Sequence, residues 1–81
     1  MIVFDEKNNV STDNVTILLD VEEAHQLLGY LKLLMQSDTQ HEHYHLNNYD
    51  YSKEITIALY DKNGSLEHFS DKYKSLILSD K

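Results

Sequence analysis

Residues 20–36 read DVEEAHQLLGYLKLLMQ, and this stretch decides the fold that the sequence predicts. Its apolar residues recur every three or four positions, which is the spacing of one helix face. This stripe consists of Val21, Ala24, Leu27, Leu28, Leu31, Leu34 and Met35. Asp20 and Glu23 have the spacing of a capping box, so the helix should begin directly after Asp20. We expect it to end near Gln36 and Ser37, with the stripe forming the core.

The residues before this helix predict a β-hairpin. Residues 15–19 (VTILL) are β-branched and apolar, as strands prefer, and residues 2–4 (IVF) are a shorter candidate. The polar residues 6–14 would form a long connection between the two strands.

The residues after the helix predict further strands. Residues 41–46 (HEHYHL) alternate in the manner of a strand, and a polar loop with two tyrosines follows at 47–53. Residues 54–60 (EITIALY) form a clear strand pattern. Its apolar face consists of Ile55, Ile57 and Leu59.

A turn is expected at residues 61–64 (DKNG), with Gly64 in the left-handed conformation of a type I turn with a glycine bulge. This register keeps an aromatic residue on the apolar face. The pairs that it predicts are Ile57 with Phe69 and Tyr60 with Leu66. A last strand is expected at about residues 74–78, after a short turn at 70–72.

Together these elements predict an α+β fold with a single antiparallel β-sheet of about four to six strands. One amphipathic helix would pack on one face of that sheet. Residues 1–81 would form a single domain, because the chain is short and shows neither a linker nor an internal repeat. The other face of the sheet would be partly solvated and free to carry function.

The charge of the chain favours a basic partner. Fourteen acidic residues stand against seven basic ones, a formal net charge of −7, and all seven bases are scattered lysines. Nucleic-acid binding is disfavoured, because phosphate neutralisation needs clustered lysine and arginine. An acidic protein attracts a basic partner by complementary charge, although acidity that serves only solubility is the alternative.

Other classes are excluded by what the sequence lacks. There is no cysteine, so neither a disulfide nor a thiolate metal site is available. Residues 1–7 (MIVFDEK) do not resemble a signal peptide. No apolar run approaches the ~18 residues that a membrane span needs. We therefore expect a cytoplasmic protein that does not enter a membrane.

His41, His43 and His45 are the conspicuous chemical feature. Residues two apart on a strand share a face, so the three imidazoles should point the same way. One metal ion cannot bind all three, since the outer pair would lie about 13 Å apart along a strand. His43 and His45 could chelate with a third ligand, for example His68 or Glu54. The alternative is a row of half-exposed or partner-binding histidines, and we predict neither a metal nor a cofactor.

No catalytic residue is predicted. Seven serines occur in polar contexts, and none lies in a Gly-x-Ser-x-Gly elbow. With two glycines in the whole chain, no phosphate-binding loop can be recognised. We therefore expect a binding protein and not an enzyme.

Tyrosines crowd the segment around the histidines and alternate with acidic residues. Tyrosine is enriched at interface hot spots, since it buries a large area with little loss of entropy. The predicted partner-binding patch consists of Glu42, His43, Tyr44, His45, Tyr49, Asp50, Tyr51 and Glu54. The alternative is that Tyr44 and Tyr51 are ordinary core aromatics.

A helix followed by His43-Tyr44-His45-Leu46, by Tyr51 and by Glu54-Ile55 resembles the polymorphic-toxin immunity protein family numbered thirty-two. Members are small proteins whose pattern runs His-x-His-Leu, Trp-Gly-Gly and Glu-Leu. The similarity covers residues 15–60. Here Tyr51-Ser52-Lys53 stands where the family has Trp-Gly-Gly, and the gap to Glu54 is one residue shorter. The resemblance implies a toxin-binding role without specifying the toxin.

Three hypotheses result. The first is an immunity protein that binds and neutralises a cognate, basic bacterial toxin, acting as a monomer or homodimer. The second is a small metal-binding or regulatory module that uses the row of His41, His43 and His45. The third is an enzyme subunit whose active site lies at an oligomer interface.

Overall fold

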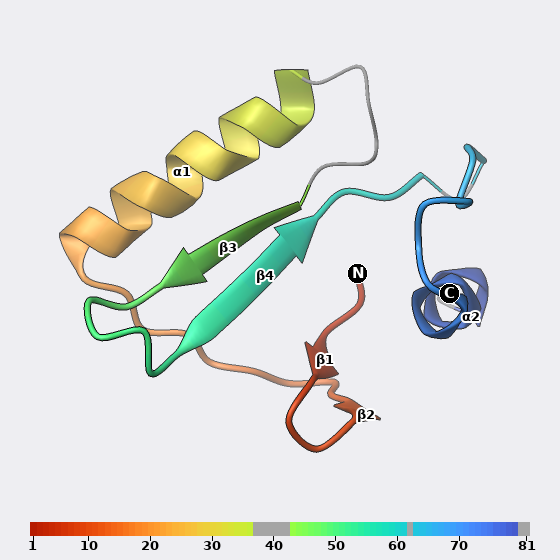
Figure 1. The fold of residues 1–81 in the computed structure, drawn as a ribbon, viewed down its shortest axis with the longest axis horizontal. Helices are drawn as coiled ribbons and strands as arrows, with labels where there is room; N and C mark the ends of the chain where they lie inside the picture. The colour runs from red at the N-terminus through yellow and green to blue at the C-terminus, as the bar shows by residue number, and fades with distance from the viewer. Residues whose placement is uncertain (37–42, 62, 80–81) are drawn as a thin grey trace.

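The computed structural model describes residues 1–36, 43–61 and 63–79, and it contains two helices and four short strands (Figure 1). In chain order these elements are β1 (Phe4–Asp5), β2 (Val10–Ser11), α1 (Val21–Gln36), β3 (His43–Asn47), β4 (Glu54–Ala58) and α2 (Asp71–Ser79). The α+β class is confirmed. The prediction of a single sheet is wrong, because the described strands form two separate two-stranded antiparallel sheets, β1–β2 and β3–β4.

Helix α1 begins where the sequence predicts. The Asp20 backbone N–H donates to Glu23 Oε1 at 3.0 Å, and the Glu23 N–H donates to Asp20 Oδ1 at 2.8 Å. These reciprocal bonds satisfy backbone donors that have no partner within the helix. The capping box is therefore confirmed, and α1 runs to Gln36, the last residue described before the gap at 37–42.

The buried face of α1 differs from the predicted stripe. Leu34 is buried and Leu27 half-buried, as expected, but Val21, Leu28 and Met35 are exposed. Tyr30 lies on the packed face instead, and its ring stacks on that of Tyr44 with centroids 5.0 Å apart and planes 5° apart. A two-stranded sheet is too narrow to cover the wide apolar surface of this helix.

Strands β3 and β4 pair in a register that places their large apolar side chains on the same face of the sheet. Tyr44 lies opposite Ile57, and the next inward pair is Leu46 with Ile55. Leu46 is almost fully buried. The residues between them in sequence face away from α1, as strand alternation requires. Strand β4 ends at Ala58, two residues before the predicted end, and the first two residues of the predicted strand at 41–46 lie outside the described residues.

The predicted strand at residues 15–19 is wrong. That segment has no regular structure, and β1 pairs instead with β2, Phe4 opposite Ser11. The Asp5 carboxylate accepts hydrogen bonds from the backbone of Lys7 and Asn8 and from the Asn8 side chain, which folds the chain back. This local hairpin forms because closing a short loop costs less entropy than closing the predicted nine-residue connection.

The predicted last strand is also wrong, because residues 71–79 form α2. Ser70 caps this helix: its Oγ accepts from the Tyr73 N–H at 3.4 Å, and its carbonyl accepts from the Lys74 N–H at 2.9 Å. Tyr73 and Ile77 turn to the same side, four positions apart, and Ile77 is buried. The apolar residues of this segment therefore follow helical spacing, which our strand interpretation missed.

The predicted hairpin after β4 is also wrong. Its second strand is missing: the described residues 65–69 form turns, and β4 pairs with β3 alone among the described strands. The Gly64 N–H does donate to the Asp61 carbonyl at 3.0 Å, so a turn forms there. Neither described glycine has a positive φ, however, which contradicts the predicted left-handed Gly64.

Helix α2 packs against the N-terminal hairpin, on the opposite side of the molecule from the start of α1 (Figure 1). The rings of Phe4 and Tyr73 meet edge to face, with centroids 6.2 Å apart. Lys72 Nζ lies 4.5 Å from the Phe4 ring centroid and 3.1 Å from Glu6 Oε2. The Tyr73 hydroxyl donates to the Glu6 carboxylate. Neither helix of the described residues is long and apolar enough to span a membrane.

Candidate partner-binding site

The loop between β3 and β4 is held by its own hydrogen bonds. Asn48 Oδ1 accepts from the Lys53 N–H at 2.9 Å, and Asn48 Nδ2 donates to Ser52 Oγ at 3.0 Å. The Tyr51 N–H donates to the Asn48 carbonyl at 3.1 Å. A loop tied in this way presents its outward side chains in a fixed arrangement, so less entropy is lost when a partner binds.

Asp50 keeps its charge at the tip of this loop. Hydrogen bonds from the side chain and the backbone N–H of Ser52 hold the pKa of Asp50 below its ordinary value. The backbone bond measures 3.1 Å to Asp50 Oδ1. Hydrogen bonding to the ionised form favours that form. The loop therefore carries a fixed negative charge beside its two tyrosines.

Tyr49 and Tyr51 are the most exposed aromatic side chains of the described residues, with 94% and 78% of their surface accessible. Tyr51 also has a φ of 59°, in the left-handed region. A bulky residue in that conformation costs roughly 1–2 kcal/mol relative to a right-handed one. Such strain is concentrated at functional sites. The loop therefore holds an exposed aromatic ring in a conformation that stability alone does not favour.

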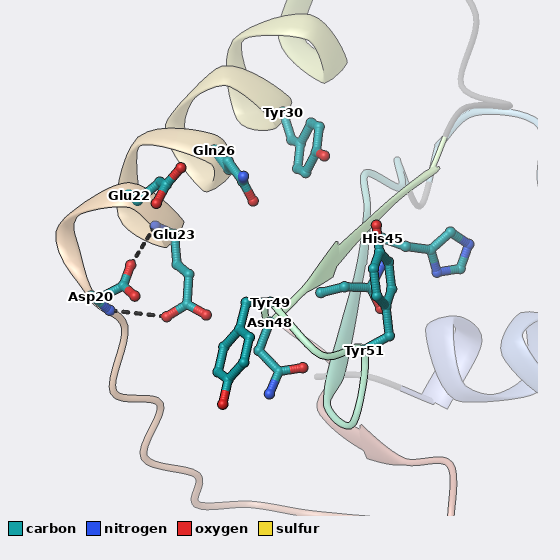
Figure 2. Close-up of a pocket in the computed structure, with 10 residues that line it drawn as sticks. Asp20, Glu22, Glu23, Gln26, Tyr30, His45, Asn48, Tyr49 and Tyr51 are labelled. Atoms are coloured by element: carbon teal, nitrogen blue, oxygen red, sulfur yellow. Dashed lines mark hydrogen bonds between the residues drawn. The ribbon is translucent and has the colours of Figure 1, made fainter.

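A groove of about 270 Å³ separates this loop from the first turns of α1 (Figure 2). We call it the acidic–tyrosine groove. Its lining residues are Asp20, Glu22, Glu23, Gln26, Tyr30, His45, Asn47, Asn48, Tyr49 and Tyr51. In Figure 2 the Glu23 side chain extends from α1 toward the loop that carries Tyr49 and Asn48. The groove thus has carboxylates and Tyr30 on its α1 wall and the rings of Tyr49 and Tyr51 on its loop wall.

His43 and His45 lie on the sheet face that points away from α1. Their rings are 5.0 Å apart and nearly perpendicular, so the predicted shared face is confirmed for this pair. His45 Nδ1 lies 2.9 Å from Thr56 Oγ1 and 3.3 Å from Glu54 Oε1. His41 lies outside the described residues.

The predicted third metal ligands differ in their positions. Glu54 is beside His45, but His68 lies against Phe69, with ring centroids 4.4 Å apart. Within residues 1–36, 43–61 and 63–79, no group of three or more histidine or acidic side chains is placed to hold a metal ion.

The structure divides the predicted partner-binding patch between several places. Tyr49, Asp50 and Tyr51 stand on the loop. His43, His45 and Glu54 belong to the open sheet face, although His45 also borders the groove. Tyr44 is half-buried against Tyr30, the core position that the sequence left open. Glu42 lies outside the described residues.

Sequence reasoning missed the α1 wall of the groove. The spacing of Asp20 and Glu23 predicts only a helix cap. No local pattern connects residues 20–26 with residues 45–51, because they meet only when α1 packs on β3.

The fold and this groove define a class: a small, acidic α+β protein with an exposed groove lined by carboxylates and tyrosines. No protein-family model matches the chain, and neither a curated protein nor a solved structure matches it. The resemblance to the immunity protein family therefore stays a prediction.

Proposed function

We propose that this protein is an immunity-type binding protein that neutralises a cognate, basic bacterial toxin by covering part of its surface, without catalysis. The acidic–tyrosine groove is the observation that carries the proposal. It combines carboxylates from α1 with the exposed Tyr49 and Tyr51 of the adjoining loop.

The chemistry of the groove suits a lysine or arginine side chain of the partner. Carboxylates form charge-assisted hydrogen bonds with such cations, and tyrosine faces attract them through cation–π interaction. A volume of about 270 Å³ is small for a drug-sized ligand, whose pockets start at about 300 Å³. It accommodates an inserted side chain well. The net charge of −7 draws a basic partner toward this surface.

The exposed tyrosines supply the apolar part of the interface. Each ring offers a large contact area with little rotamer entropy to lose, and the hydrogen-bonded loop already fixes their backbone. This combination is typical of a pre-organised recognition site. The resemblance of His43–Leu46 and Glu54-Ile55 to the immunity family points to a toxin as the class of partner.

Co-expression with a candidate toxin tests the proposal. Where the gene immediately upstream of this chain's gene encodes a large secreted protein, its C-terminal domain is the toxin to use. We expect the wild-type chain to bind this domain and to protect cells that express it. Tyr49→Ala combined with Tyr51→Ala should weaken binding at least about thirtyfold, as loss of hot-spot residues does.

A charge-reversal pair separates the groove from net charge. Glu22→Lys changes the groove, whereas Glu67→Lys makes the same charge change at an exposed position that does not line it. Glu22→Lys should lose protection, and Glu67→Lys should keep most of it. Equal loss in both would mean that overall charge suffices. A chain that neither binds nor protects against this toxin domain would overturn the proposed function.

A further inference from the structure

Helix α1 carries a second apolar face that is exposed among the described residues 1–36, 43–61 and 63–79. The side chains of this face, which we call the seam, are Val21, Ala24, Leu28, Leu31 and Met35. All five are exposed, and the four larger side chains range from 36% of the surface for Leu31 to 75% for Val21. They are a different set from Leu27, Tyr30 and Leu34, which face β3.

The spacing of the seam indicates what covers it. Successive members are separated by three, four, three and four residues, which is the alternating a/d pattern of a coiled coil. This pattern fits side chains into the gaps of another helix that carries the same repeat. The seam runs along about 21 Å of helix. The seam positions contain no charged residue, so a matching apolar surface can pack against them directly.

We propose that a second copy of this chain covers the seam, forming a two-fold symmetric dimer in which the two α1 helices pack antiparallel. A two-fold axis pairs one seam with an identical seam, so a single surface serves both subunits. An apolar face this continuous on a small protein typically marks an interaction surface.

Charge selects the antiparallel arrangement. The first turn of α1 is acidic, with Glu22 and Glu23 directly after Asp20, and its last turn has no basic residue. Parallel helices would bring the two acidic turns together. In antiparallel helices, each acidic first turn lies near the C-terminal half of the partner helix. That half carries Lys32, one helical turn after Leu28. The two helix dipoles then also oppose each other.

The dimer would leave the acidic–tyrosine groove open. Glu23, Gln26 and Tyr30 line that groove, and at about 100° per residue they lie roughly 130° around the helix axis from the centre of the seam. The inference is thus independent of the proposed function. A dimer would present two grooves, while a monomer would still present one.

Sedimentation equilibrium on the full chain, from about 5 to about 500 µM, tests the dimer directly; a seam this short predicts weak, reversible association. Leu28→Glu should raise the dissociation constant at least about tenfold. Leu33→Glu is the matched control, because Leu33 is on the same helix and 48% exposed, against 50% for Leu28, but lies off the seam. A wild-type chain that stays monomeric throughout overturns the proposal, and so does equal weakening by both variants.

Cross-linking keeps the proposal testable should Leu28→Glu fail to fold. The chain has no cysteine, so single cysteines can be placed freely. A short bismaleimide should join Val21→Cys chains to Met35→Cys chains in a mixture. It should not join Met35→Cys chains to one another, since an antiparallel seam holds these positions about 21 Å apart. Efficient joining of Met35→Cys alone would indicate parallel helices and overturn the arrangement, as would failure of the mixture to cross-link.

Discussion

At the scale of single residues, Tyr51 shows a conflict between stability and recognition. Its left-handed backbone suits glycine or asparagine better than a bulky aromatic residue. The loop nevertheless places an aromatic ring there, with most of its surface in solvent. A residue that costs stability and exposes most of its ring is consistent with the partner-binding surface proposed above.

The Tyr51→Gly variant should separate these two effects. Glycine removes the cost of the left-handed conformation but adds chain entropy in the unfolded state, so the free energy of unfolding should rise by about 0.5–1 kcal/mol. Binding to the toxin domain should weaken in the same variant. Tyr49→Gly is the control, because Tyr49 does not have a positive φ and should only lose stability. Urea unfolding measures the free energy of unfolding of both variants. A destabilised Tyr51→Gly would contradict the strain argument.

Asp50 provides a pH dependence of known sign. Its folded pKa is lowered, so its ionised form contributes stability above the unfolded pKa of about 3.9, and this contribution is lost as the pH falls through the lower folded value. Asp50→Asn should therefore unfold at lower urea than the wild type at pH 6. Below about pH 4 the two midpoints should converge. A difference that stays constant from pH 6 to pH 3 would exclude the carboxylate as its source.

At the scale of elements, α1 has two apolar faces with different tasks. The face with Leu34 holds the helix on β3, and the seam with Leu28 is exposed. An amphipathic helix on a wider sheet would bury both. Because this sheet has two strands, the helix keeps apolar surface that is available for a second molecule.

Alanine substitutions along α1 should follow this division. Leu34→Ala removes a buried side chain and should cost about 2–5 kcal/mol of unfolding free energy. Leu28→Ala and Leu33→Ala, both about half exposed, should each cost less than about 1 kcal/mol when measured in dilute monomeric protein. Urea melts at a few micromolar provide the comparison. A Leu28→Ala cost equal to that of Leu34→Ala would place the core on the predicted stripe after all.

At the scale of the whole molecule, acidity and a small core act together. The buried apolar side chains of the described residues are Leu34 and Leu46 between α1 and the β3–β4 sheet, and Ile77 in α2. So small a core leaves modest stability. With so few side chains buried, most positions of the described residues lie at the surface and can carry charged side chains.

Association with a basic toxin domain should depend strongly on salt. The Debye length falls from about 30 Å at 0.01 M to about 3 Å at 1 M ionic strength, which screens attraction over the surface. We expect the association rate constant to fall at least about tenfold over that range, with a smaller change in the dissociation rate. Stopped-flow mixing measures both rates. A flat association rate would remove long-range electrostatic attraction from the account.

Sequence alone determined those features whose physical causes are local. The capping bonds between Asp20 and Glu23 join residues three apart, so their spacing was enough to place the start of α1. The alternation of residues 43–47 likewise placed His43 and His45 on one face. The net charge of −7 is a property of composition and needed no fold.

Tertiary structure decided what local pattern leaves ambiguous. Residues 74–78 carry apolar side chains compatible with a strand or a helix, and packing of Tyr73 against Phe4, together with the cap at Ser70, selects the helix. The segment at 15–19 has strand propensity but obtains no partner strand, because β1 pairs with the nearer β2. The groove arises only where the first turns of α1 meet the β3–β4 loop. Contacts between distant segments carry no signature in either segment alone, which is why they had to be seen in the folded chain.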